Sequence, residues 1–480
     1  MLLLFPNYLT SAQIGLISVF SALAMPLAAV SNFGSIFTIN RFLPYYRTFE
    51  GPKKSDLPIL TTGVSLVGFM LVMSLVWVFN SEIVKWFDKS PLLVEYFELL
   101  PFFTLGYLFC SILQAFNNGY FHTVWVGTVT EVVYRLFNLI LILGIIAGLY
   151  AFDAMFCMYI FIFWTGALLF YLKLKKEKQF YFNFRVSALS RRMGQMIIKY
   201  AAFFWGATLF SVLATFIDTI VLAGVQGLEK SGLLMIATYF VTLTIVPQRS
   251  IVSVSVPVIA ESWRRHDMEN ISMVYRKSAN NMLWAGGGIF LVIMANINYL
   301  LSYLPVEYHE IKWVVFVLGL AKICDYATGV NQNIISLSRK NWKMDFYANV
   351  LLVLMLIPLN YYLISNYSIM GAAYANLIAF FIYNAVKSVY LWKVFRLSPF
   401  DRQNSKLIVW LGLLLLIFSW EAGLSGVNAY GFWENALHIA FRSFLCLTIY
   451  VVGMLFFKTS EDFRSIVFQT FSNIRKYLNV

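Results

Sequence analysis

The stretch GLLMIATYFVTLTIVPQRSIVSVSVPVIA, residues 232–260, has a single charged side chain, Arg249, among its 29 positions. About 20 apolar residues are enough for a helix to cross the ~30 Å hydrocarbon layer of a membrane. Lipid offers the backbone no hydrogen-bond partners, and a helix satisfies its backbone groups internally. The stretch is therefore predicted to be a membrane-spanning helix that carries a permanent charge.

Runs of this kind recur along the whole chain. Of its 480 residues, 60% are hydrophobic, 18% are aromatic and only 12% are charged, whereas roughly a quarter of the residues of soluble proteins are charged. The sequence thus predicts an all-α polytopic membrane protein. We expect thirteen visible spans, at 13–37, 57–79, 94–116, 123–149, 151–172, 196–223, 232–260, 280–301, 313–337, 344–365, 367–392, 406–422 and 434–457.

The net charge of +13 is distributed very unevenly between the two sides of the predicted membrane. Loops on one side hold 28 lysines and arginines, against four on the other side, Lys85, Lys89, Lys230 and Lys312. The positive-inside rule places the basic loops and the C-terminus in the cytoplasm. The basic charge then reflects membrane topology and contact with lipid headgroups, so a nucleic-acid partner is not expected.

Residues suited to catalysis or metal binding are scarce. The four histidines lie at the edges of different loops, so they predict neither a zinc site nor a catalytic triad. The four cysteines lie within apolar runs and are expected to be free thiols. Every outward connection is short, the longest being about 80–93, which leaves little room for a catalytic domain. We expect no enzyme, no metal and no cofactor.

Two stretches indicate an internal duplication. Gly15-Leu16 follows the polar turn TSAQ and Gly232-Leu233 follows GLEKS, each near the start of a span that ends at a basic loop. Two spans with the same direction at equivalent places indicate a parallel repeat about an axis normal to the membrane. We expect an N-terminal lobe at 1–172, a cytoplasmic linker at 173–195, a C-terminal lobe at 196–395 and an additional helix pair at 405–457.

The sequence also makes a prediction for each end of the chain. The opening MLLLFP is too short to span, so most of a first helix is expected to be missing, through a start site placed too far downstream. That helix would bring the thirteen spans to fourteen. Residues 460–480 place apolar side chains at helical spacing between cations, which is typical of an amphipathic helix on the cytoplasmic membrane surface.

Charged side chains inside spans are costly and normally face a bundle interior or an aqueous cavity. Glu131 and Arg135 are one helical turn apart, and Lys322 and Asp325 are three residues apart. Both pairs are expected to be structural ion pairs that neutralise each other. Arg135 and Lys322 also lie at a depth similar to that of Arg249, which makes them secondary candidates for the same binding site.

Arg249 has no acidic residue nearby in the sequence. Gln248 adjoins it and Ser253 shares its helix face, which indicates a hydrogen-bonding lining. The pattern predicts that Arg249 and these neighbours face a central cavity and bind an anion.

Asp218 and Pro247 are the remaining candidates. Asp218 lies in the outer third of its span, where it either binds a coupling ion or simply reaches toward water. Pro247 lies inside a span, where proline removes one backbone hydrogen bond and permits a kink. The kink could be a hinge or a static bend.

Five blocks of the sequence resemble the polysaccharide-exporting flippases, an O-antigen flippase family of the multidrug/oligosaccharidyl-lipid/polysaccharide (MOP) superfamily. They are FPNYLTSAQIGLI, NRFLPYY, IDTIVLAGVQGLEKSGLLMIATYFVTLTIVPQRSIVSVSVPVIAESW, DYATGVNQNIISLSRKNWK and IMGAAYANLIAFFIYNAVKSVYLWKVFRLSPF. The blocks cover nearly the whole chain in the order of the family, and GAAYAN is the most specific of their motifs.

The resemblance implies two six-helix lobes around a central cavity, a terminal helix pair, and alternating access without ATP. The implied cargo is an undecaprenyl-diphosphate-linked oligosaccharide, moved to the outer leaflet of a bacterial inner membrane for polysaccharide or O-antigen assembly. A glycan polymerase and glycosyltransferases would be further partners. The alternatives are a drug or metabolite antiporter of the same superfamily and a scaffold of a glycan-assembly complex that transports nothing.

Overall fold

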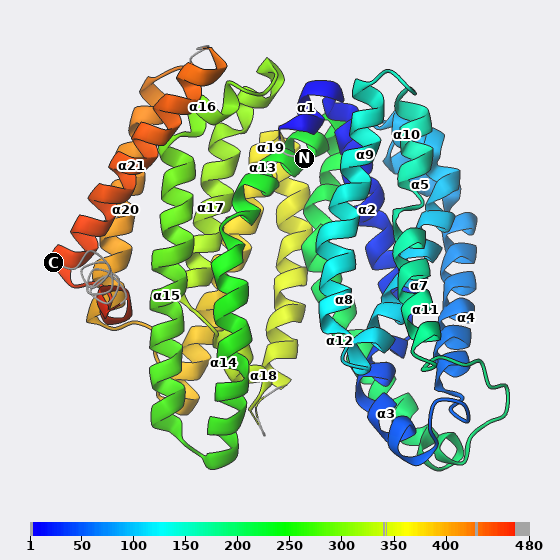
Figure 1. Ribbon diagram of the computed structural model, residues 1–480. Coiled ribbons are helices and arrows are strands. Elements are labelled where there is room, and N and C mark those ends of the chain that lie inside the picture. Colours follow the sequence, from blue (N-terminus) through cyan, green and yellow to red (C-terminus); the bar gives the residue numbers. More distant parts are fainter. Residues whose placement is uncertain (1–2, 339–340, 342, 428–430, 466–480) are drawn as a thin grey trace, which may run out of the picture. The chain divides into compact units, whose positions relative to one another are not determined.

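The structure, a computed structural model, describes residues 3–338, 341, 343–427 and 431–465 (Figure 1). Within these ranges, ten helices are long and apolar enough to cross a membrane, or eleven when the bent pair α13 (Leu228–Thr242) and α14 (Ile245–Arg265) is counted as one span. The predicted all-α polytopic class is confirmed, and the chain is a multi-pass membrane protein.

The thirteen expected spans all fall on helical segments, and two local features explain the lower count. The stretches 344–365 and 367–392 form one element, α19 (Lys343–Phe395), which turns at Ser368 with a φ of 51°. The stretch 313–337 is divided into α17 (Lys312–Ala327) and α18 (Asn331–Ser336), and neither is long enough to span alone.

The chain forms two compact units, and the first comprises residues 3–232. Its core helix is α2 (Ser11–Ser31), which contacts α4 (Leu57–Val78), α7 (Leu100–Gly119) and α12 (Ala188–Gln226). The remaining elements are α1 (Leu4–Tyr8), α3 (Ser35–Phe49), α5 (Asn80–Trp86), α6 (Pro91–Tyr96), η1 (Phe97–Leu99), α8 (Thr123–Gly127), η2 (Thr128–Val133), α9 (Tyr134–Ile146), α10 (Phe152–Tyr159) and α11 (Ile162–Lys176). Because α12 packs on α2 and α3, the contacts place the end of this unit at Gly232, beyond the basic linker at 173–195.

The second unit comprises residues 233–480, of which the structure describes 233–338, 341, 343–427 and 431–465. Its core helix is α15 (Met268–Ala295), which contacts α14, α17, α20 (Arg402–Leu424) and α21 (Phe432–Phe457). Of the apolar window of α15, 72% is buried, compared with 22% for α21, so α15 is central and α21 peripheral. The short elements α16 (Ile297–Leu301) and η3 (Val306–Ile311) connect α15 to α17. The expected amphipathic helix at 460–480 lies mostly outside the described residues.

The first unit contains a close crossing of α2 and the beginning of α13. Thr10 and Gln13 cap α2 reciprocally, and each side chain accepts a hydrogen bond from the other residue's backbone N–H, at 3.3 and 3.0 Å. One turn later, a Cβ added at Gly15 would lie 1.9 Å from the Leu228 carbonyl oxygen, and one at Gly232 would lie 2.0 Å from the Ser11 carbonyl oxygen. Glycine at both positions allows the two backbones to touch.

We expect Gly15→Ala to destabilise the protein by about 1–3 kcal/mol, because the new methyl group meets backbone that cannot rotate away. The measurement is thermal unfolding of the purified protein in detergent. Gly63→Ala, within α4 and with no atom within 4 Å of the added Cβ, is the control and should be neutral or slightly stabilising. Equal unfolding temperatures for the two variants would contradict the close crossing.

Candidate functional site

The helix that carries Arg249 is broken. The break separates α13 from α14 with a bend of 54°, and Pro247 lies in the first turn of α14. At the break, the hydroxyl groups of Thr244 and of Tyr326 on α17 share a hydrogen bond of 2.7 Å. Gly286 of α15 leaves room for that ring, since a Cβ there would lie 2.6 Å from it. The kink expected near Pro247 is present, whereas motion about it stays a prediction.

A second broken helix lies in the same unit, where α17 ends at Ala327 and α18 begins at Asn331. Gly329 adopts a φ of +54° in this break, and a Cβ there would lie 2.8 Å from the Ala279 nitrogen. The Asn384 side-chain oxygen of α19 accepts hydrogen bonds from the Thr328 hydroxyl and the Asn331 amide, both at 3.0 Å. Side chains of α19 therefore satisfy groups on both sides of the break.

Asp325, in the last turn of α17, connects the two breaks. Its carboxylate accepts hydrogen bonds from the Gln248 amide of α14 at 2.9 Å and from the Asn384 amide of α19 at 3.4 Å. In the described part of the chain, Asp325 does not form the ion pair expected with Lys322. Lys322 instead places its ammonium 5.2 Å from the centre of the Phe380 ring. Gln248, predicted to line the site, thus also fixes the start of α14.

Arg249 and Ser253 are both exposed on α14. Ser250, between them, is also exposed, and the Ser253 hydroxyl donates to its carbonyl oxygen at 2.8 Å. Arg249 lies near the middle of the 228–265 helix pair, in the turn after the break. An exposed guanidinium at that depth is too costly to face lipid and requires an aqueous environment.

A buried ion pair that the sequence analysis missed lies in α19. Lys387 was counted among the basic loop residues, but its side chain is 0% exposed and its ammonium lies 2.8 Å from the Asp345 carboxylate. The Tyr383 hydroxyl also contacts Lys387 and donates to the Asn349 side-chain oxygen at 3.2 Å. The pair joins the two segments of α19 on either side of the turn at Ser368.

In the first unit, the expected ion pair between Glu131 and Arg135 is confirmed, at 2.6 Å. Glu131 lies in the π-helical turn η2 and Arg135 in the following helix α9. The two side chains are 53% and 73% exposed, so the pair stays accessible. Asp218 of α12 is half-buried and accepts a 2.7 Å hydrogen bond from the Thr219 backbone N–H.

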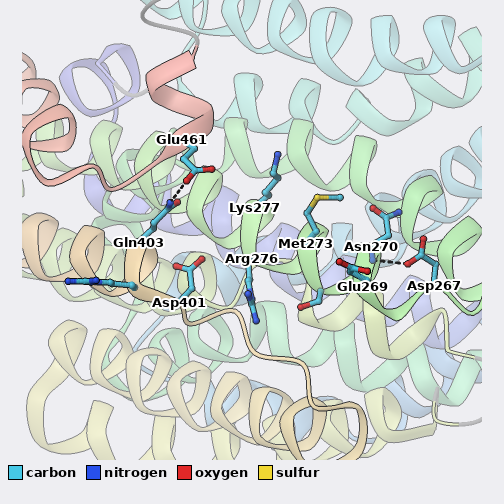
Figure 2. Close-up of a pocket in the computed structure, with 11 residues that line it drawn as sticks. Asp267, Glu269, Asn270, Met273, Arg276, Lys277, Asp401, Gln403 and Glu461 are labelled. Atoms are coloured by element: carbon cyan, nitrogen blue, oxygen red, sulfur yellow. Dashed lines mark hydrogen bonds between the residues drawn. The ribbon is translucent and has the colours of Figure 1, made fainter.

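A cavity of about 790 Å³ lies where α15 and α20 begin (Figure 2). Its charged lining is mixed, with Arg276 and Lys277 beside Asp267, Asp401 and Glu461. Glu461 follows α21 and accepts a 2.9 Å hydrogen bond from Gln403 of α20. The acidic residues make this cavity a poor site for an anion.

Comparisons with known proteins show the fold. No protein-family profile and no curated protein sequence matches the chain. The solved structure of the lipid II flippase MurJ in an inward closed conformation matches with a TM-score of 0.67 at 18% identity, over 95% of this chain and 96% of that one. An inward-facing multidrug resistance MATE family transporter of the MOP superfamily matches with a TM-score of 0.66 at 14% identity, over 85% of this chain and 93% of that one. The chain therefore shares its fold with these two membrane proteins.

We expect Lys387→Met to destabilise the protein by about 3–5 kcal/mol, because it leaves the Asp345 carboxylate without its cation inside the bundle. The matched variant, Arg135→Met, breaks an exposed pair and should cost at most about 1 kcal/mol. Thermal unfolding in detergent measures both changes. A Lys387→Met protein as stable as Arg135→Met would show that the buried pair contributes little.

Proposed function

We propose that this chain is a flippase that moves an undecaprenyl-diphosphate-linked oligosaccharide across the bacterial inner membrane by alternating access. The observation that carries the proposal is Arg249, an exposed arginine near the middle of a spanning helix. The fold is shared with a lipid II flippase, which supports a lipid-linked cargo. The basic loops and the C-terminus then lie in the cytoplasm, where the cargo is made.

The break before Arg249 adds to its attraction for an anion. Because α14 starts anew at Ile245, the backbone N–H groups of its first turn lack partners within the helix. The positive end of the α14 dipole points in the same direction as these groups. A diphosphate that has lost its hydration shell would gain both this field and the charge-assisted hydrogen bonds of the guanidinium.

The cargo divides naturally between two environments. Its diphosphate and sugars need a polar path through ~30 Å of hydrocarbon, whereas its apolar polyprenyl chain can stay within the hydrocarbon layer. Lys322, Gln248 and Ser253 are proposed to complete the polar path with Arg249 in the second unit. A glycan polymerase and glycosyltransferases of the same pathway would supply and consume the cargo.

The charges favour this proposal over its alternatives. A cationic drug would need available carboxylates, but Asp325 accepts hydrogen bonds from two amides and Asp345 is paired with Lys387. A scaffold without transport would have no use for an exposed arginine at that depth, where a cation costs about 2.5–3.5 kcal/mol.

We expect Arg249→Ala to abolish flipping, and Arg249→Lys to retain a small part of it, because an ammonium lacks the planar fork of the guanidinium. The measurement is surface glycan in a flippase-deficient strain, with the membrane level of each variant recorded in parallel. Arg264→Ala, on the same helix but in its last turn, is the control and should behave as the unchanged protein. Normal surface glycan with Arg249→Ala would contradict a role in cargo binding.

Asp218 is proposed to bind the coupling ion. If a proton or sodium ion on its carboxylate biases the protein between two states, Asp218→Asn should weaken transport and leave the amount of protein in the membrane unchanged. Transport is measured with and without an imposed ion gradient. An Asp218→Asn protein whose transport responds to the gradient as before would return Asp218 to a structural role.

A further inference from the structure

A groove of about 420 Å³ lies between α14 and α15 in the second unit. Its walls are mainly aliphatic, with Ile251, Val254 and Val258 on α14 and Val274 on α15. Ser250, the neighbour of Arg249, also lines it. The groove therefore starts next to the candidate anion-binding residue and continues along an apolar surface.

The polar side of the groove is formed by Lys277, Asn281 and Asp462. One Asp462 carboxylate oxygen lies 3.1 Å from the Lys277 ammonium, and the other accepts a hydrogen bond from the Asn281 amide at 3.2 Å. Lys277 and Asn281 are four residues apart on α15, so their side chains lie on the same helix face. Together they hold both oxygens of one anionic group.

The surroundings fix these donors at the level of the membrane surface. Asn280, beside Asn281, donates to the Asn404 side chain at 2.6 Å and to the Thr459 carbonyl oxygen at 2.9 Å. Asn404 lies in the first turn of the spanning helix α20, and Thr459 lies two residues after the end of the spanning helix α21. Because two spanning helices end here, Lys277 and Asn281 lie where lipid phosphate groups are found.

Asp462 is held loosely enough to be displaced. The side chains of Lys277 and Asp462 are 57% and 34% exposed, and an ion pair with that much access to water is weak. Phe463 adds a ring contact of 5.1 Å with Trp284, whose indole donates to the Asn281 oxygen at 3.0 Å. This last bond orients Asn281 so that its amide nitrogen faces the carboxylate.

A phosphate in this groove would meet the same two donors with more negative charge than Asp462 provides. In the neighbouring cavity, Glu461 and Asp401 would repel it. Lys277 lines both cavities, and in Figure 2 its side chain extends away from Arg276. The charges therefore direct an anionic headgroup to the groove.

We propose that Lys277 and Asn281 form a receiving site for the phosphate head of a polyprenyl carrier, that the aliphatic groove takes its first isoprenoid units, and that Asp462 occupies the site when no lipid is bound. The site rests on the proposed function and gives the cargo a first binding site at the membrane surface, before it is moved toward Arg249.

The experiment measures binding of farnesyl diphosphate, a short polyprenyl diphosphate, to the full chain purified in detergent. Asp462→Asn should bind it about five- to tenfold more tightly, because the competing carboxylate loses its charge. Lys277→Gln should bind about tenfold more weakly and Lys277→Arg nearly normally. Glu434→Gln is the control, since Glu434 lies in the first turn of α21, at the other end of that helix from the groove, and its affinity should equal that of the unchanged protein.

A second measurement follows the tail segment itself. Spin labels at Met273→Cys and Ser465→Cys, in a Cys157→Ser background, should move apart when farnesyl diphosphate binds and stay in place with farnesol. Unchanged affinity in both Asp462→Asn and Lys277→Gln would overturn the receiving site. Equal binding of phosphatidylglycerol would overturn the polyprenyl assignment in favour of a general anionic-lipid site. If the unchanged protein does not bind farnesyl diphosphate at all, that result would contradict the proposed function as well as the receiving site. If it binds but the two variants bind equally well, only the receiving site is contradicted.

Discussion

A helix that breaks inside a membrane loses part of its internal backbone hydrogen bonding. The second unit contains two such breaks, and side-chain hydrogen bonds to neighbouring helices hold both of them in place. Thr244, at the break before α14, bonds to Tyr326 of α17. Asn384 of α19 bonds to groups on both sides of the break after α17. Asp325 then ties the two breaks together, so the bend in one helix is fixed by the end of another. Arg249 owes its position to this arrangement.

Three of the cations within the spanning helices of this unit, Lys387, Lys322 and Arg249, have different surroundings. Lys387 is fully buried and paired with Asp345, and Lys322 lies over the Phe380 ring. A ligand could reach Lys387 only by breaking a buried ion pair, which is strongly destabilising. Arg249 is exposed, so an anion can approach it without dismantling the core. Its exposure, more than its charge alone, singles it out for binding.

The sequence predicted the features that depend on local pattern. The spans follow from apolar length, and the bend near Pro247 follows from the effect of proline on a helix. The Glu131–Arg135 pair follows from its spacing of one helical turn. It missed Lys387–Asp345, because that pair forms only when α19 turns back at Ser368, and the sequence does not show which residues then meet.

Asn384 shows a different limit. An uncharged amide inside an apolar run gives no sign of its role, although here it satisfies groups from two other helices. Asp325 was assigned to Lys322 because the two are close in sequence, yet amides from α14 and α19 hold its carboxylate instead. These two amides come from other helices, so spacing along α17 could not have shown which groups contact Asp325. Gln248 adjoins Arg249 in the sequence, so the hydrogen bond from its amide to Asp325 holds the bend and also fixes the position of Arg249.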